Sequence, residues 1–277
     1  MDEKYRLKPT LILPELSVIA LTGVFSYFAS NKKAKISYLI IFSESPMGAS
    51  LNALTFIAMM AFVVIMMLVL IKRGFLRIVK YFIKASSFLV SFFLINWYAE
   101  LFFSDYLSQI QNIDTILLIA STYLAMVLYL LMYSKNTIAQ IFVVIIISSL
   151  TGTFLGISTP IISSITLMIA LIIYDYISVF KGPLKDLIKR VNIEEFFGAV
   201  FTYEGLTIGM GDLVFYSMLA STAMINFGLI AFFASSIGIL IGVFISFKML
   251  EKREVFPGLP LVLGFGLIFM VLTVLMH

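Results

Sequence analysis

Cysteine is absent from the 277 residues, and charged residues make up only 12% of them. Without cysteine the chain has no disulfide, no thiolate metal site and no cysteine nucleophile. Its single histidine, His277, offers no cluster of metal ligands, so we expect neither a metal nor another cofactor. Soluble domains carry about 25% charged residues. So little charge beside 61% hydrophobic residues predicts a polytopic membrane protein.

Long apolar runs divide the chain into candidate membrane spans. A helix needs about 20 mostly apolar residues to cross a bilayer. This measure predicts an all-α membrane protein in which residues 1–277 form one polytopic domain with nine transmembrane helices. The predicted spans are residues 11–30, 50–71, 81–103, 114–133, 137–155, 160–180, 207–226, 228–247 and 258–276. The seventh and eighth spans follow each other so closely that residues 226–228 must form a tight turn.

The basic residues are distributed very unevenly over the predicted connections. If the N-terminus is cytoplasmic, all 19 Lys and Arg residues lie in cytoplasmic segments except Lys32, Lys33 and Lys35. Lys and Arg accumulate in the cytoplasmic loops of membrane proteins. We therefore predict a cytoplasmic N-terminus and, with nine spans, a C-terminus on the outer side. The net charge of +4 follows from this distribution, and we expect no nucleic-acid partner.

Two aspartates lie near the cytoplasmic ends of consecutive predicted spans. Asp175 belongs to the sixth span, and Asp212 lies near the start of the seventh at a similar depth. An ionised carboxylate is costly in hydrocarbon, so an acid there indicates a functional site by default. Two neighbouring carboxyls can share one proton, with the ionised acid deprotonating a water and the protonated acid donating to a carbonyl oxygen. This pattern predicts aspartyl proteolysis inside a membrane.

Other interpretations of the acids stay open at this point. Intramembrane carboxyls also serve ion- or proton-coupled transporters and channels. A prepilin/preflagellin-type peptidase also uses a Gly-x-Gly-Asp sequence, which this chain has at residues 209–212, but it lacks the Tyr-Asp span at residues 174–175 and the Pro-x-Leu element at residues 257–259. Glu15 and Glu100 stand near the ends of their spans, and we interpret both as interfacial residues rather than catalytic ones.

The predicted connection of about residues 181–206 is the longest segment outside the spans. Apolar residues recur at helical spacing from Ile193 to Phe201, which favours an amphipathic helix at the cytoplasmic interface. We expect a short extended piece to follow it before Gly209. A protease binds its substrate in an extended form, and adding a peptide as a strand is a known recognition mode. We therefore expect residues 202–208 and Pro257–Leu261 to flank the substrate.

Three short motifs occur in order along the second half of the chain. They are Tyr174-Asp175, Gly209-Met210-Gly211-Asp212 and Pro257-Gly258-Leu259-Pro260. Their order, their spacing and their places on the sixth, seventh and ninth spans resemble the presenilin/signal peptide peptidase family of GxGD intramembrane aspartyl proteases. The resemblance is sharp over about residues 165–265, while the first five spans match only in number and hydropathy. Phe215-Tyr216-Ser217 and the predicted orientation look more like presenilin.

The resemblance implies that Asp175 and Asp212 are the catalytic pair of an aspartic endopeptidase. Its substrates would be transmembrane segments of other proteins or signal-peptide remnants. The site-shaping or substrate-binding residues that it implies are Tyr174, Gly209, Gly211, Pro257, Gly258, Leu259 and Pro260. The family usually has alanine where this chain has Gly258, and glycine keeps the backbone free to approach the aspartates closely. We expect Leu259 to act on the pair through packing.

The short connection between the sixth and seventh spans suggests a compact presenilin-like microbial homologue. We expect it to be an integral, multi-pass protein of the cell membrane, with the lipid bilayer as its surroundings. Auxiliary subunits are not expected to be required, and homo-oligomerisation stays open. The sequence does not identify the natural substrate or the cleavage site.

Overall fold

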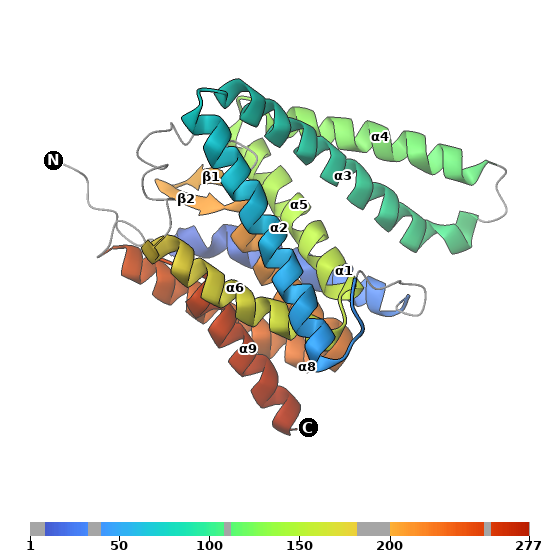
Figure 1. Cartoon of the computed structure of the whole chain (residues 1–277). Helices are drawn as coiled ribbons and strands as arrows, with labels where there is room; N and C mark the ends of the chain where they lie inside the picture. The colour runs from blue at the N-terminus through green and yellow to red at the C-terminus, as the bar shows by residue number, and fades with distance from the viewer. Residues whose placement is uncertain (1–8, 33–39, 108–111, 182–199, 252–255, 277) are drawn as a thin grey trace.

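The computed structural model describes residues 9–32, 40–107, 112–181, 200–251 and 256–276, and helices dominate these ranges (Figure 1). The helical elements are η1 (Pro9–Ile12), α1 (Leu13–Ser30), α2 (Pro46–Lys72), α3 (Leu76–Leu107), α4 (Ile113–Met132), α5 (Thr137–Ser158), α6 (Ile161–Lys181), α8 (Met210–Leu250) and α9 (Leu259–Met276). Eight of the described helices are long and apolar enough to cross a membrane. The boundaries of the predicted spans and of the observed helices differ by a few residues. Helix α3, for example, extends beyond its predicted span at both ends.

Helix α8 contains the predicted seventh and eighth spans. Gly228 within it has φ 83° and ψ −170°, a conformation that essentially only glycine adopts. A Cβ atom on Gly266 of α9 would lie 2.5 Å from Leu219 Cδ2 and 2.8 Å from Ile239 Cγ1. A straight helix would separate Leu219 from Ile239 by about 30 Å, at about 1.5 Å per residue. The chain therefore reverses at Gly228, which confirms the tight turn. That nine segments cross the membrane stays a prediction.

A β-hairpin connects the end of the predicted loop to α8. Strands β1 (Val200–Tyr203) and β2 (Leu206–Gly209) are antiparallel, with Phe201 opposite Ile208. Glu204 and Gly205 form the turn with φ 46° and 83°, as a two-residue hairpin turn requires. Residues 202–208 were expected to be extended, and they lie within the hairpin and its turn.

One expectation at this place was wrong. Phe201 was expected to end a helix, but Val200 and Phe201 belong to β1, where Phe201 is 1% exposed. The seventh span was expected to start at about residue 207, and the helix begins at Met210, directly after β2. Strand pairing and burial of Phe201 outweigh the helical spacing, because apolar residues i and i+4 can also be read as alternate positions of a strand. Residues 191–199 of the expected helix lie outside the described residues.

Small residues set the distance between α5 and the first half of α8. A Cβ atom on Gly156 would lie 2.7 Å from Ser221 Cβ, and one on Gly152 would overlap Ser217. Ser217 Oγ donates to Ser149 O at 3.1 Å and lies 2.6 Å from Thr22 Oγ1 of α1. Close backbone approach and interhelical hydrogen bonds are the usual basis of helix association in membranes. This contact fixes α1, α5 and α8 together next to the start of α8.

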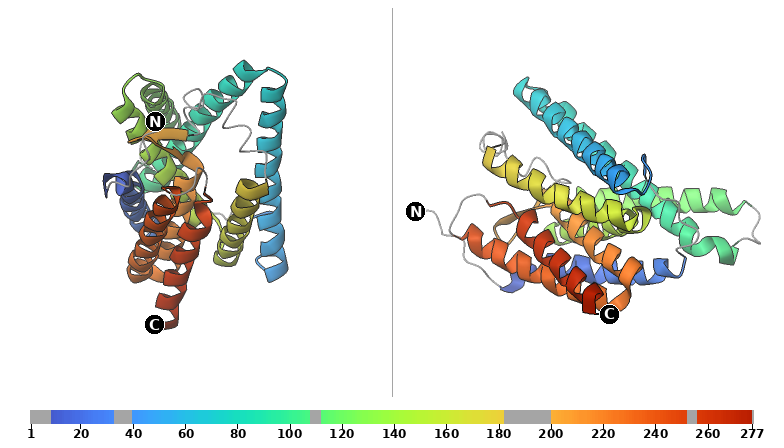
Figure 2. Two further views of the ribbon diagram at one scale, coloured as in Figure 1. Left: turned by 90° about the vertical axis from the view of Figure 1, so that its left-hand side faces the viewer. Right: turned by 60° about the horizontal axis from the view of Figure 1, so that its bottom comes forward.

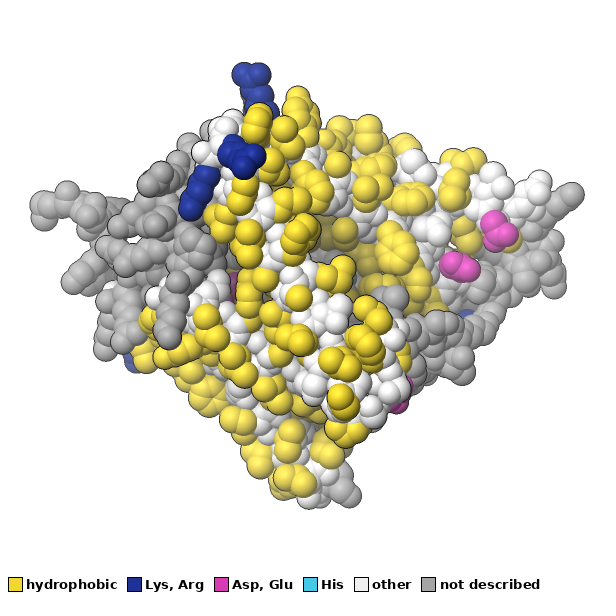
Figure 3. All heavy atoms as spheres, in the orientation of Figure 1, with side chains coloured by type: hydrophobic (Ala, Val, Ile, Leu, Met, Phe, Trp, Pro, Cys, Tyr) yellow, Lys and Arg dark blue, Asp and Glu magenta, His cyan; other side chains and the backbone are white. Residues whose placement is uncertain are grey.

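The remaining helices flank this central group. Helices α2 and α6 pack on each other and form a separate layer, which reaches α8 and α9 through α6 (Figure 2). Helices α3 and α4 pair on another side, with α4 against α5. The surface is mostly hydrophobic, and basic side chains gather at one end over the connection between α2 and α3 (Figure 3). Lys72, Arg73 and Arg77 are exposed there.

Candidate active site

Asp175 lies in the last turns of α6 and faces the start of α9. Its Oδ2 atom accepts a hydrogen bond from the backbone N–H of Leu259 at 3.2 Å. Leu259 is the first residue of α9, where backbone N–H groups have no partner within the helix. The side chain of Asp175 is half-buried, whereas that of Leu259 is 5% exposed. The third motif therefore contacts the first aspartate, although through its backbone rather than through packing alone.

Asp212 is the third residue of α8 and directly follows the hairpin. Gly209, the last residue of β2, precedes the helix with φ −75° and ψ 130°. A Cβ atom on Gly209 would lie 3.4 Å from Asp212 Oδ2, so glycine leaves room beside the carboxyl group. A Cβ atom on Gly211 would meet nothing within 4 Å among the described residues, so no close neighbour requires a glycine there.

The fold brings the two aspartates together from α6 and α8. Their carboxyl groups are near enough to interact electrostatically, and both interact with the hydroxyl group of Tyr216, one turn after Asp212. Two like charges held near each other at a partly buried site are unfavourable, so a pair of this kind favours one shared proton. The arrangement thus offers one acid and one base side by side.

The other predicted site residues take up different positions around this pair. Pro257 is buried, Gly258 and Pro260 are half-buried, and a Cβ atom on Gly258 would lie 3.7 Å from the Tyr216 hydroxyl oxygen. The Gly258 carbonyl oxygen accepts from the backbone N–H of Val262 at 3.3 Å. Tyr174 is half-buried, and its hydroxyl group makes no hydrogen bond within the described ranges, so nothing ties it to the aspartates.

Two residues near the pair escaped the sequence analysis. Glu15 was interpreted as interfacial, but it is 1% exposed and interacts electrostatically with Asp212. Tyr216, 5% exposed, lies within electrostatic reach of Glu15, Asp175 and Asp212. The signal for Glu15 was present, because an acid inside an apolar span indicates function by default. The position of Glu15 near the end of its span does not show that it is interfacial, since Asp212 also lies near the end of a span.

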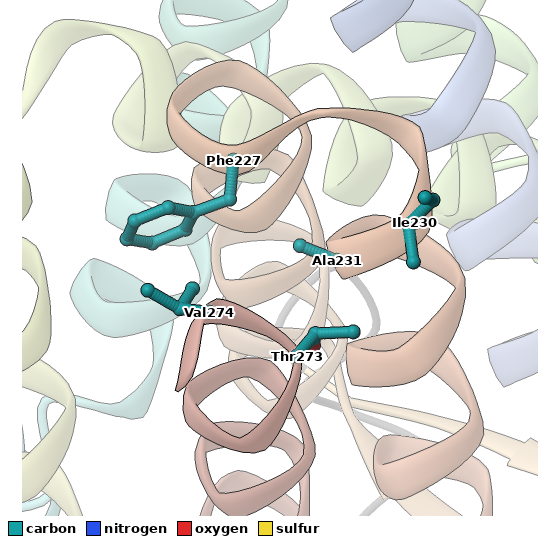
Figure 4. A pocket seen from close by; sticks show the side chains of 5 residues that line it. All are labelled: Phe227, Ile230, Ala231, Thr273 and Val274. Carbon is teal, nitrogen blue, oxygen red and sulfur yellow. The ribbon is translucent and has the colours of Figure 1, made fainter. Parts of the chain in front are cut away.

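The two best-defined cavities lie away from the aspartates. A cavity of about 290 Å³ is lined by Phe227, Ile230, Ala231, Thr273 and Val274, at the reversal of α8 and the end of α9 (Figure 4). Gly228 is 16 residues from Asp212, or about 24 Å along a helix. A second cavity of about 170 Å³ lies between α2, α5 and α6, around Asn52 and Ser163. Within the described part of the chain, no group of three acids or histidines is arranged to hold a metal.

Comparison with known proteins agrees with these observations. The chain is 30% identical to Presenilin-B of Dictyostelium discoideum over 119 residues, which are 39% of this chain and 25% of the relative. The matched region thus spans about a quarter of that relative. Structures of a presenilin family intramembrane aspartate protease in two space groups superpose with TM-scores of 0.69 and 0.68. The identities are 18% and 19%, and the matches cover 97% and 98% of this chain and 100% of the others.

These structural matches show the fold, and the long apolar helices show an integral, multi-pass membrane protein. A family model described as Presenilin matches residues 16–196, well over half of the chain. This protein belongs to the presenilin family.

Proposed function

We propose that this protein is an intramembrane aspartic endopeptidase, with Asp175 and Asp212 as its catalytic pair. Its substrates are transmembrane segments of other proteins or signal-peptide remnants, cleaved near the cytoplasmic side. One observation carries the proposal: two carboxyl groups from α6 and α8 lie within electrostatic reach, and the start of α9 donates a backbone hydrogen bond to one of them. Family membership supports the same reading.

The hydrogen bond from Leu259 suggests which aspartate is the base and which is the acid. A carboxylate is stabilised by a backbone N–H donor, so the negative charge of the pair rests best on Asp175. Asp175 then acts as the base that deprotonates the attacking water. Asp212 keeps the proton and donates it to the carbonyl oxygen of the substrate. No metal or cofactor is needed for these steps.

The hairpin before α8 supports a way to present the substrate. Each strand of a two-stranded sheet has one edge whose N–H and C=O groups are available to a further strand. Strand β2 leads directly into the helix that carries Asp212, and Thr202 and Thr207 are exposed on the hairpin. A substrate added along this edge as an extended strand would pass beside the aspartates with its peptide bonds accessible.

The transporter interpretation has no observation in its favour. Within the described residues, Asp175 and Asp212 lie within electrostatic reach of each other, and the larger of the two cavities lies at the reversal of α8, away from both. We also propose that the chain works without auxiliary subunits. The oligomeric state of the purified protein will show whether it forms homo-oligomers.

The test is cleavage of a transmembrane reporter peptide by the purified protein in liposomes. Asp175→Ala and Asp212→Ala should each abolish cleavage, while both variants insert and purify like the wild type. Asp114→Ala, which changes an exposed acid of α4, is the matched control and should cleave normally. Near-normal turnover in either catalytic variant would refute the assignment of the pair. A wild type that cleaves no reporter but carries ions down a gradient would favour transport.

A further inference from the structure

The turn of the β-hairpin contains a residue that the backbone conformation does not favour. Glu204 has φ 46°, in the left-handed region, and Gly205 follows it with φ 83°. A two-residue turn with positive φ at both positions is usually built from Asn, Asp or Gly. Glutamate is uncommon at such a position, so the conformation of the turn does not explain Glu204. The explanation has to come from the contacts of its side chain.

The carboxyl group of Glu204 is hydrogen-bonded to the first element of the described chain. Thr10 Oγ1 donates to Glu204 Oε2 at 2.8 Å, the usual length of an O–H···O bond, although the two residues are 194 positions apart. Thr10 belongs to η1, which runs directly into α1. Helix α1 is held against α8 by the contact between Thr22 and Ser217. The bond therefore joins the hairpin turn to the central group of α1, α5 and α8.

The turn is the end of the hairpin that needs such a connection. A two-stranded hairpin is marginally stable by itself, and β1 and β2 have four residues each. The other end of β2 is fixed, because Gly209 continues directly into α8, and Phe201 and Ile208 are buried on one face. Leu206 lies about 10 Å from Gly209 along the strand. A small rotation at Gly209 would therefore displace the turn more than the residues beside Asp212.

We propose that Glu204 and Thr10 are substrate-positioning residues, whose hydrogen bond holds the free edge of the hairpin ready for an added substrate strand. The inference rests on the proposed proteolytic function and concerns how its extended substrate is bound. A strand adds to an edge through backbone hydrogen bonds, which require the N–H and C=O groups of that edge to be aligned. An edge that is already ordered avoids the entropic cost of ordering it on binding.

This role separates substrate binding from the chemical step. Loss of the bond from Thr10 leaves the aspartates unaltered, so kcat should change little. KM should rise, because the hairpin edge then has to be ordered at the moment of binding. If Glu204 only completed the turn, Glu204→Gly would have the opposite effect, since glycine adopts positive φ freely and makes such a turn more stable.

The test measures kcat and KM for the transmembrane reporter peptide in liposomes. Thr10→Val keeps the shape of the side chain and removes the donor, whereas Glu204→Gly removes the acceptor. Each should raise KM about three- to tenfold, as loss of one hydrogen bond does, and should change kcat less than about twofold. The double variant should behave like either single variant, because both changes remove the same bond.

Conservative variants separate the hydrogen bond from the side chains themselves. Thr10→Ser keeps the donor and Glu204→Gln keeps an acceptor, so both should have a KM close to that of the wild type. Thr122→Val changes an exposed threonine of α4 and is the matched control. It should leave kcat and KM unchanged.

Hydrogen exchange gives a second measurement that does not depend on cleavage. The backbone amides of residues 200–209 should exchange faster in Thr10→Val and in Glu204→Gly than in the wild type, because the turn is no longer held. The amides of α5 should exchange as in the wild type. Thr10→Ser should restore the slower exchange of the hairpin.

Three results would overturn the inference. A wild-type KM in both Thr10→Val and Glu204→Gly would show that the bond does not assist substrate binding. A lower kcat at unchanged KM would assign the two residues to another role. Unchanged exchange of residues 200–209 in both variants would show that the bond does not order the hairpin. Failure of the proposed function looks different, because the wild type itself would then cleave nothing.

Discussion

The hydrogen bond from the Leu259 N–H to Asp175 Oδ2 can be removed without changing any titratable residue. Proline has no backbone N–H, and the first position of a helix tolerates it because the N–H there has no partner within the helix. Leu259 occupies this position in α9. Leu259→Pro therefore deletes the donor to Asp175 and leaves the helix intact. Leu259→Ala is its counterpart, because it keeps the N–H and removes most of the buried side chain.

The expected magnitude follows from the geometry. A hydrogen bond to a charged group contributes about 1.5–3 kcal/mol, and the 3.2 Å between Leu259 N and Asp175 Oδ2 lies at the long end of the usual range. A loss of about 1.5 kcal/mol corresponds to about tenfold in kcat/KM and about one pH unit. Because the N–H stabilises the ionised form of the pair, its loss should move the acidic limb of the pH profile toward neutral pH.

The assay is kcat/KM against pH for a reporter peptide, combined with a thermal melt of each variant. Leu259→Pro should show the shifted acidic limb. Leu259→Ala should lower turnover and cost about 2–5 kcal/mol of stability, as deletion of a buried leucine usually does, with the limb in its wild-type place. An acidic limb that moves equally in both variants would refute the reasoning, because the effect would then come from packing rather than from the donor.

Three further outcomes are expected. Gly258→Ala should retain activity, since its Cβ atom would meet the Tyr216 hydroxyl at an ordinary 3.7 Å, whereas Gly258→Trp should abolish cleavage; equal activities would contradict a site role for Gly258. The wild-type pH profile should be bell-shaped, because the pair lacks a base when both acids are protonated and lacks an acid when both are ionised; a flat profile from pH 4 to 9 in folded protein would argue against the mechanism. Gly156→Ala should lower stability by about 1–3 kcal/mol, since its Cβ would lie 2.7 Å from Ser221 Cβ; an unchanged melt would show that α5 and α8 can separate freely.

Much of the fold was predictable because it depends on local composition. The length of an apolar run fixes a membrane helix, and the turn at Gly228 was predictable from two runs separated by too few residues for a loop. The hairpin could not be predicted in this way, because the spacing of its apolar residues fits a helix as well as a strand when the partner strand is unknown. Strand β1 is defined by pairing with β2 and by burial of Phe201, which are tertiary properties.

The site shows the same division. Asp175 and Asp212 were predictable because an ionised carboxylate within an apolar membrane span costs free energy, whatever the position of that span in the fold. The hydrogen bond from the Leu259 N–H to Asp175 was not predictable from the sequence, since every residue except proline has a backbone N–H. Only the packing of α9 against α6 brings this N–H group to the carboxyl group. Glu15 was missed because depth in the membrane, estimated from span boundaries, does not reveal burial against α8.

Helix N-termini explain how this fold tolerates three neighbouring acids and why it does not ionise them all. Glu15 and Asp212 each lie in the first turn of a helix, and Asp175 accepts from the first N–H of α9. An N-terminus stabilises a negative charge by about 0.3–1 kcal/mol, and up to about 2 kcal/mol where it is partly buried. Burial of an ionised carboxylate costs several kcal/mol even after relaxation. Each N-terminus acts mainly on the acid nearest to it and offsets only part of the cost of burying its charge, so the fold favours a proton on some of these acids. A site built in this way has the acid and the base that peptide hydrolysis requires.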